Sequence, residues 1–180
     1  PRLKDLVKKE YEEGKADLFA AFIVRGLRIT RTRGYLGMIT MHAWMFLQSY
    51  QQLRERIVEH SRILNMAHLG AHAFETIGGE VVQTTAFLIT NFRADDESKG
   101  VYLRLVDAAF GKQKKELAFF NQDIRYSAYQ KRFRSIPGSP LSYWLEDKLI
   151  SLFESLPTLG SLCSARVGLL TSDNGRYLRL

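Results

Sequence analysis

The chain has 180 residues, of which 46% are hydrophobic and 12% aromatic, which is enough for a substantial core and excludes wholesale disorder. Its 26 Lys and Arg against 19 Asp and Glu give a net charge of +7, which suits a nucleic-acid partner without requiring one. The single cysteine, Cys163, excludes an internal disulfide framework and a cysteine-based zinc site. No apolar run could span a membrane and no signal peptide is recognisable, so we expect a cytoplasmic protein.

The N-terminal third predicts helices and a strand. Residues 3–13 form either a short helix or a solvated lead-in. Asp17 can cap a clearer helix that ends by Gly34. The apolar residues of this helix recur at helical spacing: Leu18, Phe19, Phe22, Ile23 and Leu27. Four arginines in or after it favour a solvated face over a phosphate contact: Arg25, Arg28, Arg31 and Arg33.

A parallel βαβ repeat is the expected organisation of the next segment. Residues 35–40 (YLGMIT) form a continuous apolar run that predicts a buried strand. The bulky residues 42–47 are expected to pack at its carboxyl end. Ser49 can cap a second helix, whose apolar stripe is Tyr50, Leu53 and Ile57.

Residues 66–91 predict a strand, an exposed loop and a second strand. The first apolar run ends at Gly70, and residues 81–90 are rich in β-branched and aromatic side chains. The loop holds one aromatic residue, Phe74, beside the pair Gly78 and Gly79. Such a ring at the end of a buried sheet can meet a flat ligand. From spacing alone, the favoured interpretation is that the ring folds back as a hydrophobic plug.

The following segment predicts a strand, a helix and a basic stretch. Residues 101–106 alternate in polarity, and we expect them to pair with residues 81–90 as an antiparallel hairpin. Residues 111–123 predict a helix with a basic start formed by Lys112, Lys114 and Lys115. Residues 125–135 interleave aromatic side chains with cations that include Lys131, Arg132 and Arg134. This composition suits nucleic-acid contact, and a surface linker would have the same composition.

The sequence PGSP at residues 137–140 is the strongest interruption in the chain. Ser139 as cap and Pro140 at the first helical position predict a third helix. Its expected apolar face is Leu141, Trp144, Leu145, Leu149, Leu152 and Phe153. We place a domain boundary here, which divides the chain into residues 1–135 and 136–180. Residues 167–180 predict two strands joined by an Asn-Gly turn, the second of them cut short, as in a truncated chain.

The sequence contains no complete catalytic motif. His68 and His72 have acidic neighbours, Glu75 and Glu80, but Gly70 lies between the histidines and no HExxH pattern is present, so a metal site is disfavoured. Glycine-rich nucleotide loops are absent, and neither the serines nor Cys163 have an evident catalytic base. The residues alone therefore predict a basic α/β domain without a complete active site.

Residues 15–91, from KADLFAAF to AFLITN, closely resemble the PglX-type adenine-specific DNA methyltransferases of bacteriophage-exclusion systems. These are relatives of the type IIG restriction-modification methyltransferases. The later segments IPGSPLSYWL and GLLTSDNGRYLRL are similar to the same family where its catalytic domain passes into the target-recognition region. The resemblance implies methyl transfer from S-adenosyl-L-methionine (SAM) to adenine N6 in double-stranded DNA, with other phage-exclusion or restriction proteins as further partners.

The resemblance also implies that the chain is a fragment. Its fold would be the C-terminal half of a Rossmann-like α/β methyltransferase sheet, with an antiparallel hairpin, followed by a helical and β extension. In this family the SAM loop and the Asn-Pro-Pro-Tyr (or Phe) tetrapeptide precede the helix that begins here near Asp17, and neither is present. Catalytic and cofactor-binding residues are therefore not expected in these residues, and SAM is expected to bind only the parent enzyme. Phe74 falls where the family places a ring that stacks on the extruded base, with Gly78 and Gly79 supporting the pocket.

Two departures from the family pattern and two alternative interpretations accompany this resemblance. TRTRGY replaces a Pro-Gly-Gly-Tyr turn, and Val167 stands where the family often has a polar residue. One alternative is a complete, non-enzymatic module that binds DNA or a partner through its basic segments. The other is a methyltransferase half fused to a nuclease domain.

Overall fold

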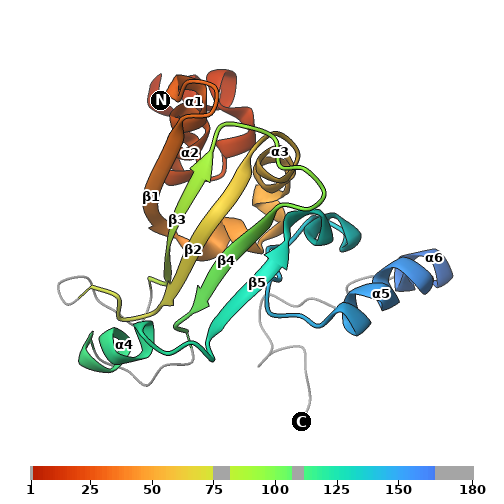
Figure 1. The fold of residues 1–180 in the computed structure, drawn as a ribbon. Coiled ribbons are helices and arrows are strands. Elements are labelled where there is room, and N and C mark those ends of the chain that lie inside the picture. The colour runs from red at the N-terminus through yellow and green to blue at the C-terminus, as the bar shows by residue number, and fades with distance from the viewer. Residues whose placement is uncertain (1, 75–81, 107–111, 165–180) are drawn as a thin grey trace, which may run out of the picture.

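A five-stranded mixed sheet in the order β1-β3-β2-β4-β5 organises the fold (Figure 1). The computed structural model describes residues 2–74, 82–106 and 112–164. The strands are β1 (Tyr35–Met41), β2 (Arg62–Gly70), β3 (Thr84–Thr90), β4 (Lys99–Arg104) and β5 (Arg125–Tyr129). The β2–β4 pair is parallel, and the β1–β3, β3–β2 and β4–β5 pairs are antiparallel. The strands β1, β2 and β4 therefore all run in one direction.

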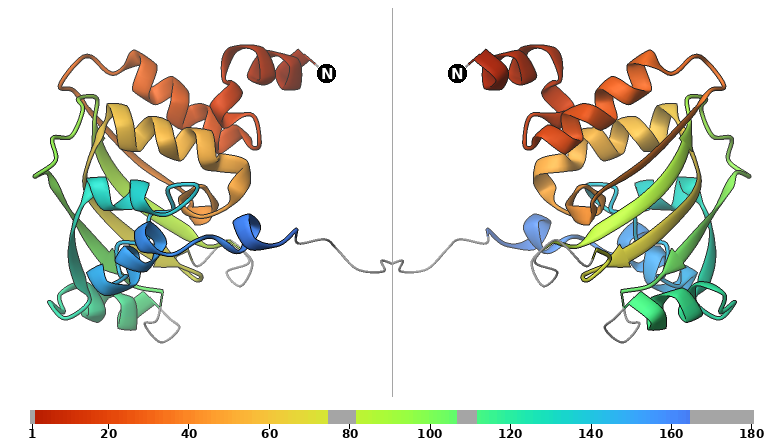
Figure 2. Two further views of the ribbon diagram at one scale, coloured as in Figure 1. Left: turned by 90° about the vertical axis from the view of Figure 1, so that its right-hand side faces the viewer. Right: turned by 90° about the vertical axis from the view of Figure 1, so that its left-hand side faces the viewer.

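The core lies between the sheet and two helices, α2 and α3, which cover the same face (Figure 2). The helices are α1 (Arg2–Glu10), α2 (Leu18–Ile29), α3 (Gln51–His60), α4 (Lys112–Phe119), α5 (Asp147–Ser155) and α6 (Leu159–Leu162). Across the described residues, no helix is both long and apolar enough to cross a membrane. The mixed α/β class predicted from the sequence is confirmed.

Helix α2 confirms the predicted cap and part of the predicted stripe: Ile23 and Leu27 are buried, and Phe19 packs against the core. The Asp17 carboxylate accepts a hydrogen bond from the backbone N–H of Phe19 at 3.4 Å. Leu18 and Phe22, however, are 44% and 55% exposed. The buried side consists of Ala20, Ala21, Ile23, Val24, Gly26 and Leu27. The absence of a side chain at Gly26 lets the helix lie close to Leu36 on β1, whereas Leu18 and Phe22 are on the other side of the helix and remain outside the core.

Strand β1 forms as predicted but is covered on one face only. Tyr35 and Ile39 are 68% and 56% exposed, because they lie on the face opposite to Leu36 and Met38, which pack against the core. The segment after it, His42–Met45, is a 3-10 helix that buries Trp44 and Met45 completely, which confirms the packing expected there.

Helix α3 has the predicted buried stripe and a different start. Tyr50, Leu53 and Ile57 are buried. The helix is preceded by a 3-10 turn (Gln48–Tyr50), so Tyr50 occupies the N-cap position without a side-chain hydrogen bond. The expected cap by Ser49 is therefore wrong.

The predicted hairpin joins the wrong strands. β3 pairs with β1 and β2, whereas β4 lies on the other side of β2. The antiparallel hairpin is therefore β2–β3. Buried and exposed residues alternate along β4, as predicted. Its other neighbour is β5, which lies within residues 125–135, where we expected a nucleic-acid contact or a surface linker. Helix α4 falls within the predicted residues 111–123.

The third predicted helix does not begin at Pro140. Residues 136–146 are irregular, Ser139 has a φ of +48°, and α5 begins only at Asp147. The Leu141 N–H donates to the Met45 carbonyl at 3.0 Å, and Leu141 and Tyr143 are part of the main core. Packing of these side chains against the sheet outweighs the local helix signal. The boundary placed near residue 136 stays a prediction, and residues 167–180 lie outside the described chain.

Two buried polar side chains connect distant segments. The Arg54 guanidinium, in a residue only 2% exposed, donates to the carbonyl oxygens of Gly138 (2.9 Å), Trp44 (2.9 Å) and Leu47 (2.5 Å). The Gln130 amide N–H₂ donates to the carbonyl oxygens of Val58 and Ser61, and its oxygen accepts from the Ile63 N–H. Arg54 thus connects α3 to the segment that contains Trp44 and Leu47 and to the segment that contains Gly138.

Candidate functional site

The carboxyl ends of three strands meet at one edge of the sheet. Because β1, β2 and β4 run in the same direction, the residues that follow them lie along this edge, where α/β proteins commonly bind ligands. Helix α4 lies beside the end of β2 there (Figure 1). We call this the carboxyl edge.

Phe74 lies in the loop that leaves β2 at this edge. Gly70 ends the strand with a φ of +67°, a conformation that favours glycine, and His72 also has a positive φ of 56°. The Phe74 side chain is 40% exposed, so part of its ring is open to solvent. Gly78 and Gly79 lie outside the described residues. The role of Phe74 in base stacking stays a prediction.

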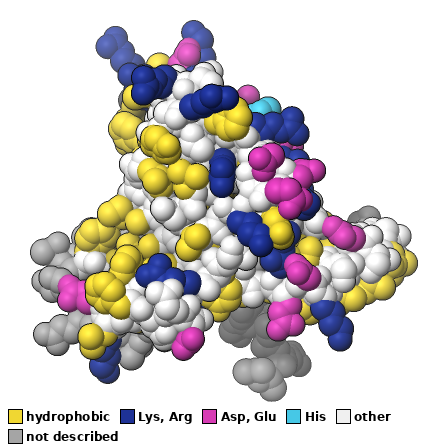
Figure 3. Space-filling model, viewed as in Figure 1, with side chains coloured by type: hydrophobic (Ala, Val, Ile, Leu, Met, Phe, Trp, Pro, Cys, Tyr) yellow, Lys and Arg dark blue, Asp and Glu magenta, His cyan; other side chains and the backbone are white. Residues whose placement is uncertain are grey.

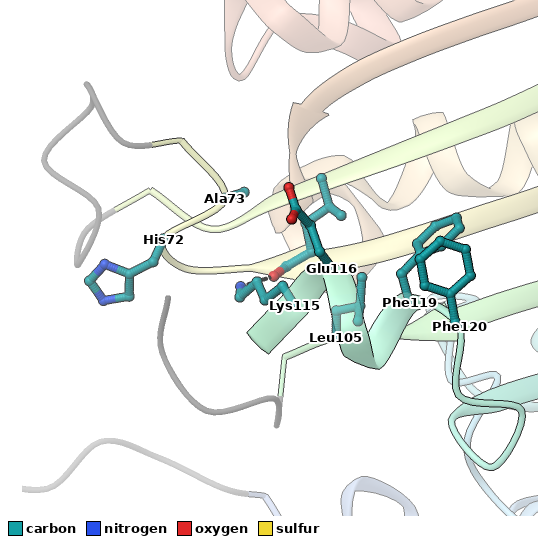
Figure 4. Close-up of a pocket in the computed structure, with 8 residues that line it drawn as sticks. His72, Ala73, Leu105, Lys115, Glu116, Phe119 and Phe120 are labelled. Carbon is teal, nitrogen blue, oxygen red and sulfur yellow. Dashed lines mark hydrogen bonds between the residues drawn. The ribbon is translucent and has the colours of Figure 1, made fainter. Parts of the chain in front are cut away.

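A largely apolar cavity of about 330 Å³ lies next to this loop (Figure 4). The lining residues come from the end of β2, the end of β4 and helix α4: Leu69, His72, Ala73, Leu105, Lys115, Glu116, Phe119 and Phe120. The rings of Phe119 and Phe120 meet edge to face at one end of the cavity, and the His72 ring points away from it.

Lys115, one of the predicted DNA contacts, is buried against the end of β2. Its ammonium group donates to the backbone carbonyls of Leu69 and Ala71, and the residue is only 9% exposed. Burial lowers the pKa of this amine. Lys115 therefore attaches α4 to the end of β2, and its DNA contact stays a prediction.

The other predicted DNA contacts do not form one patch. Lys114 is exposed on α4 at the carboxyl edge, and Lys112 begins the same helix. Three others lie in the 3-10 helix Gln130–Ser135, at the opposite edge of the sheet: Lys131, Arg132 and Arg134.

These three cations are engaged within the protein. Lys131 is 3.5 Å from Glu97, Arg132 is 3.0 Å from Asp147, and Arg134 donates to the Val58 carbonyl. The face seen in Figure 3 carries basic and acidic side chains interspersed with hydrophobic ones, including around α4 at the lower left. The net charge of +7 therefore does not produce a single basic surface on this face.

A hydrogen-bonded chain of three residues at the carboxyl edge was not foreseen. His42 Nδ1 lies 2.7 Å from His68 Nε2, and His68 Nδ1 lies 3.1 Å from the Tyr143 hydroxyl. His68 and Tyr143 are 4% and 2% exposed, whereas His42 is half-buried. Burial lowers the pKa of His42.

His68 and His72 are close in the sequence, but the histidine that contacts His68 in the structure is His42. The sequence holds one feature from which this contact could have been predicted: His42 and His68 each lie at the carboxyl end of a predicted strand. Because the two strands run in parallel, these ends meet at the same edge of the sheet. Within the described ranges, no three side chains of the His, Cys, Asp and Glu types come together as metal ligands.

Comparisons with known proteins agree with this fold. Residues 2–74 match the Eco57I restriction-modification methylase family. Over an alignment of 185 positions, the chain is 43% identical to the adenine-specific methyltransferase PglX of Lacticaseibacillus casei (strain Zhang), covering 98% of the chain and 15% of that protein. It is 39% identical to the adenine-specific methyltransferase BrxX of Escherichia coli O9:H4 (strain HS), covering 88% of the chain and 13% of that protein.

The chain is a homologue of the PglX and BrxX adenine-specific methyltransferases. It spans 13–15% of the length of these relatives. Among solved structures, it resembles the type I restriction-modification system methyltransferase subunit of Streptococcus thermophilus, with a TM-score of 0.54 at 13% identity. That match covers 76% of this chain and 33% of the solved chain, and it supports the methyltransferase-type fold. The predicted family resemblance is confirmed.

Proposed function

We propose that this chain is part of an enzyme that transfers a methyl group from SAM to adenine N6 in double-stranded DNA, in phage defence or restriction-modification. The observation that carries the proposal is the 43% identity to an adenine-specific methyltransferase across 98% of the chain. Other proteins of the same defence system are proposed partners. SAM would be bound outside these 180 residues, because neither a glycine-containing SAM loop nor an Asn-Pro-Pro-aromatic tetrapeptide occurs in them.

The proposed contribution of this chain is to hold the target base. An adenine must leave the duplex before its N6 can reach a methyl donor, at a cost of about a few kcal/mol. The partly exposed Phe74 ring would recover some of that cost by stacking on the extruded base. Gly78 and Gly79 would let the same loop approach the base closely.

Direct detection of the modified base tests this proposal. The complete enzyme that contains this sequence is incubated with DNA and SAM, and the digested DNA is analysed by mass spectrometry. We expect N6-methyladenine with the complete enzyme, and neither methylation nor calorimetrically detectable SAM binding with the 180-residue chain alone. Methylcytosine in place of methyladenine, or SAM binding by the isolated chain, would contradict the proposal.

A second candidate function is DNA binding without catalysis, favoured by the net charge of +7 and the exposed Lys114 on α4. The isolated chain should bind DNA weakly, with an affinity that falls as salt rises. Because several basic side chains are engaged within the fold, we expect only about two or three phosphate contacts, and hence a log–log salt slope of about −2 to −3.

Filter binding across a salt series measures this slope. Lys114→Ala should reduce the magnitude of the slope by roughly 0.9, the value for one phosphate contact. Lys131→Ala, which removes a lysine paired with Glu97 at the opposite edge, is the matched control and should leave the slope unchanged. An affinity that does not respond to salt would show that the net charge is ordinary surface charge.

A further inference from the structure

A groove between α1 and α2 is apolar and open to solvent. It encloses about 220 Å³, and its most buried lining residues are Val7 of α1 and Ala21 of α2. Its walls are formed by Leu3 and Leu6 of α1 and by Leu18 and Phe22 of α2. These four side chains are 44–58% exposed, so the walls of the groove are in contact with water in this chain.

An arginine lies at one end of this groove. Arg25 of α2 lines it, and its Nη1 donates to the Tyr11 hydroxyl at 3.1 Å. The Arg28 guanidinium lies over the Tyr11 ring, 5.0 Å from the centroid. Arg25 is exposed and forms no ion pair within the part of the chain that the structure describes. Because a guanidinium group binds a carboxylate through two parallel hydrogen bonds, this end of the groove suits an acidic side chain.

The two helices that form the groove carry a net positive charge. Together α1 and α2 contain six basic side chains and two acidic ones. In the turn between them, Glu12 pairs with Lys15 at 3.3 Å, and so does not offset this charge. Figure 3 shows basic side chains beside hydrophobic ones at the top of the molecule, over α1 and α2. An occupant of the groove should therefore offer apolar side chains together with negative charge.

The dimensions of the groove suit an α-helix. α1 has nine residues and is therefore about 14 Å long. A third helix laid along it would place apolar residues, spaced three and four apart, against the walls. Nucleic acid could meet Arg25 with a phosphate but would leave the leucine side chains uncovered. A second copy of the same two helices would bring like charges together.

We propose that the groove between α1 and α2 binds an acidic amphipathic helix from another part of the complete enzyme. The chain spans 13–15% of the length of the relatives PglX and BrxX, so most of a polypeptide of that kind lies outside these 180 residues. A helix in the same polypeptide is present at a roughly millimolar effective concentration, which keeps the groove occupied. Permanent cover is favoured because an exposed apolar patch promotes aggregation. The inference depends on the length of the enzyme and not on its reaction.

Photocross-linking in the complete enzyme tests this proposal. The photoreactive p-benzoylphenylalanine replaces Phe22, which is 55% exposed and so tolerates the larger ring. The purified enzyme is irradiated and digested, and mass spectrometry identifies the attached peptide. We expect a product with the mass of one polypeptide. The attached peptide should come from outside these 180 residues, carry net negative charge and have apolar residues three and four apart.

Charge reversal tests the part played by Arg25. Arg25→Glu should lower the yield of this product about threefold, because repulsion replaces an attraction at a solvent-exposed site. Changing an acidic residue of the attached peptide to lysine should restore the yield in the Arg25→Glu enzyme. Lys148→Glu is the matched control, because it makes the same change of charge on α5, outside the groove. It should leave the yield unchanged.

Several results would overturn the proposal. A product of twice the polypeptide mass would place a second copy in the groove, and no product at all would leave the groove open to water. Capture of added DNA, or of phosphatidylglycerol vesicles, in place of the peptide would assign the groove to nucleic acid or to a membrane surface. A peptide from within these 180 residues, a peptide without acidic residues, or equal losses for Arg25→Glu and Lys148→Glu would also contradict it.

Discussion

Replacement of Phe74 by alanine is expected to lower methylation by the complete enzyme about 10- to 100-fold. Stacking of a base on an aromatic side chain contributes about 1–3 kcal/mol, and each 1.4 kcal/mol corresponds to about one decade in rate. The melting temperature should hardly change, because the side chain is 40% exposed and removing it leaves no buried cavity. SAM affinity should also be unaffected, since the cofactor is proposed to bind elsewhere. Initial rates and thermal melts on the same preparations give both quantities.

Two further variants sharpen this test. Phe74→Trp should retain much of the activity, because any flat ring can stack on the base. Phe92→Ala is a matched control: Phe92 is 46% exposed in a loop at the opposite edge of the sheet, where Arg33 lies over its ring. It should leave methylation unchanged. If Phe74→Ala melts several degrees lower and methylates normally where folded, Phe74 is a packing residue and not a base-stacking one.

Replacement of Arg54 by alanine is expected to destabilise the fold by more than about 3 kcal/mol. Three carbonyl oxygens, those of Gly138, Trp44 and Leu47, would lose their donor. Each buried group left without a partner costs about 1–3 kcal/mol, and the emptied side-chain volume adds to this loss. Because domains are typically stable by only about 5–15 kcal/mol, we expect low soluble yield and a much lower urea midpoint.

The neighbouring Arg56 provides the control for Arg54. It is on the same helix, and its guanidinium forms an ion pair with Glu13 at 2.7 Å in which the two side chains are 32% and 28% exposed. Arg56→Ala should cost about 1 kcal/mol or less, because water compensates part of the lost interaction. Arg54→Lys should be intermediate, since an ammonium group lacks the planar fork that reaches three carbonyls. Equal urea midpoints for Arg54→Ala and Arg56→Ala would refute the structural role assigned to Arg54.

The sequence by itself determined the elements whose signals are local. The Asp17 cap, the apolar runs of β1 and β3 and the stripe of α3 all depend on residues within a few positions of one another, so the pattern alone identifies them. The similarity to a known family is also a property of the amino-acid sequence alone. It indicates a methyltransferase without any knowledge of which residues are in contact.

Only the tertiary structure decided which elements meet. β4 pairs with β2 and not with β3, because strand partners are chosen by packing between distant segments and not by the loop that joins consecutive strands. The helix signal at Pro140 was overridden because Leu141 and Tyr143 are buried against the sheet. In the same way, Lys115 turned inward because two backbone carbonyls at the end of β2 accept its hydrogen bonds.

The residues of the candidate site differ in the same way in whether the sequence alone could identify them. Phe74 could be proposed from the sequence because the family resemblance places a ring at that position. His42, His68 and Tyr143 could not, since His42 and His68 are 26 residues apart and Tyr143 is 75 residues beyond His68. Their hydrogen bonds exist only because two parallel strands end at the same edge and the segment after Pro140 folds back against it, an arrangement that depends on the whole sheet.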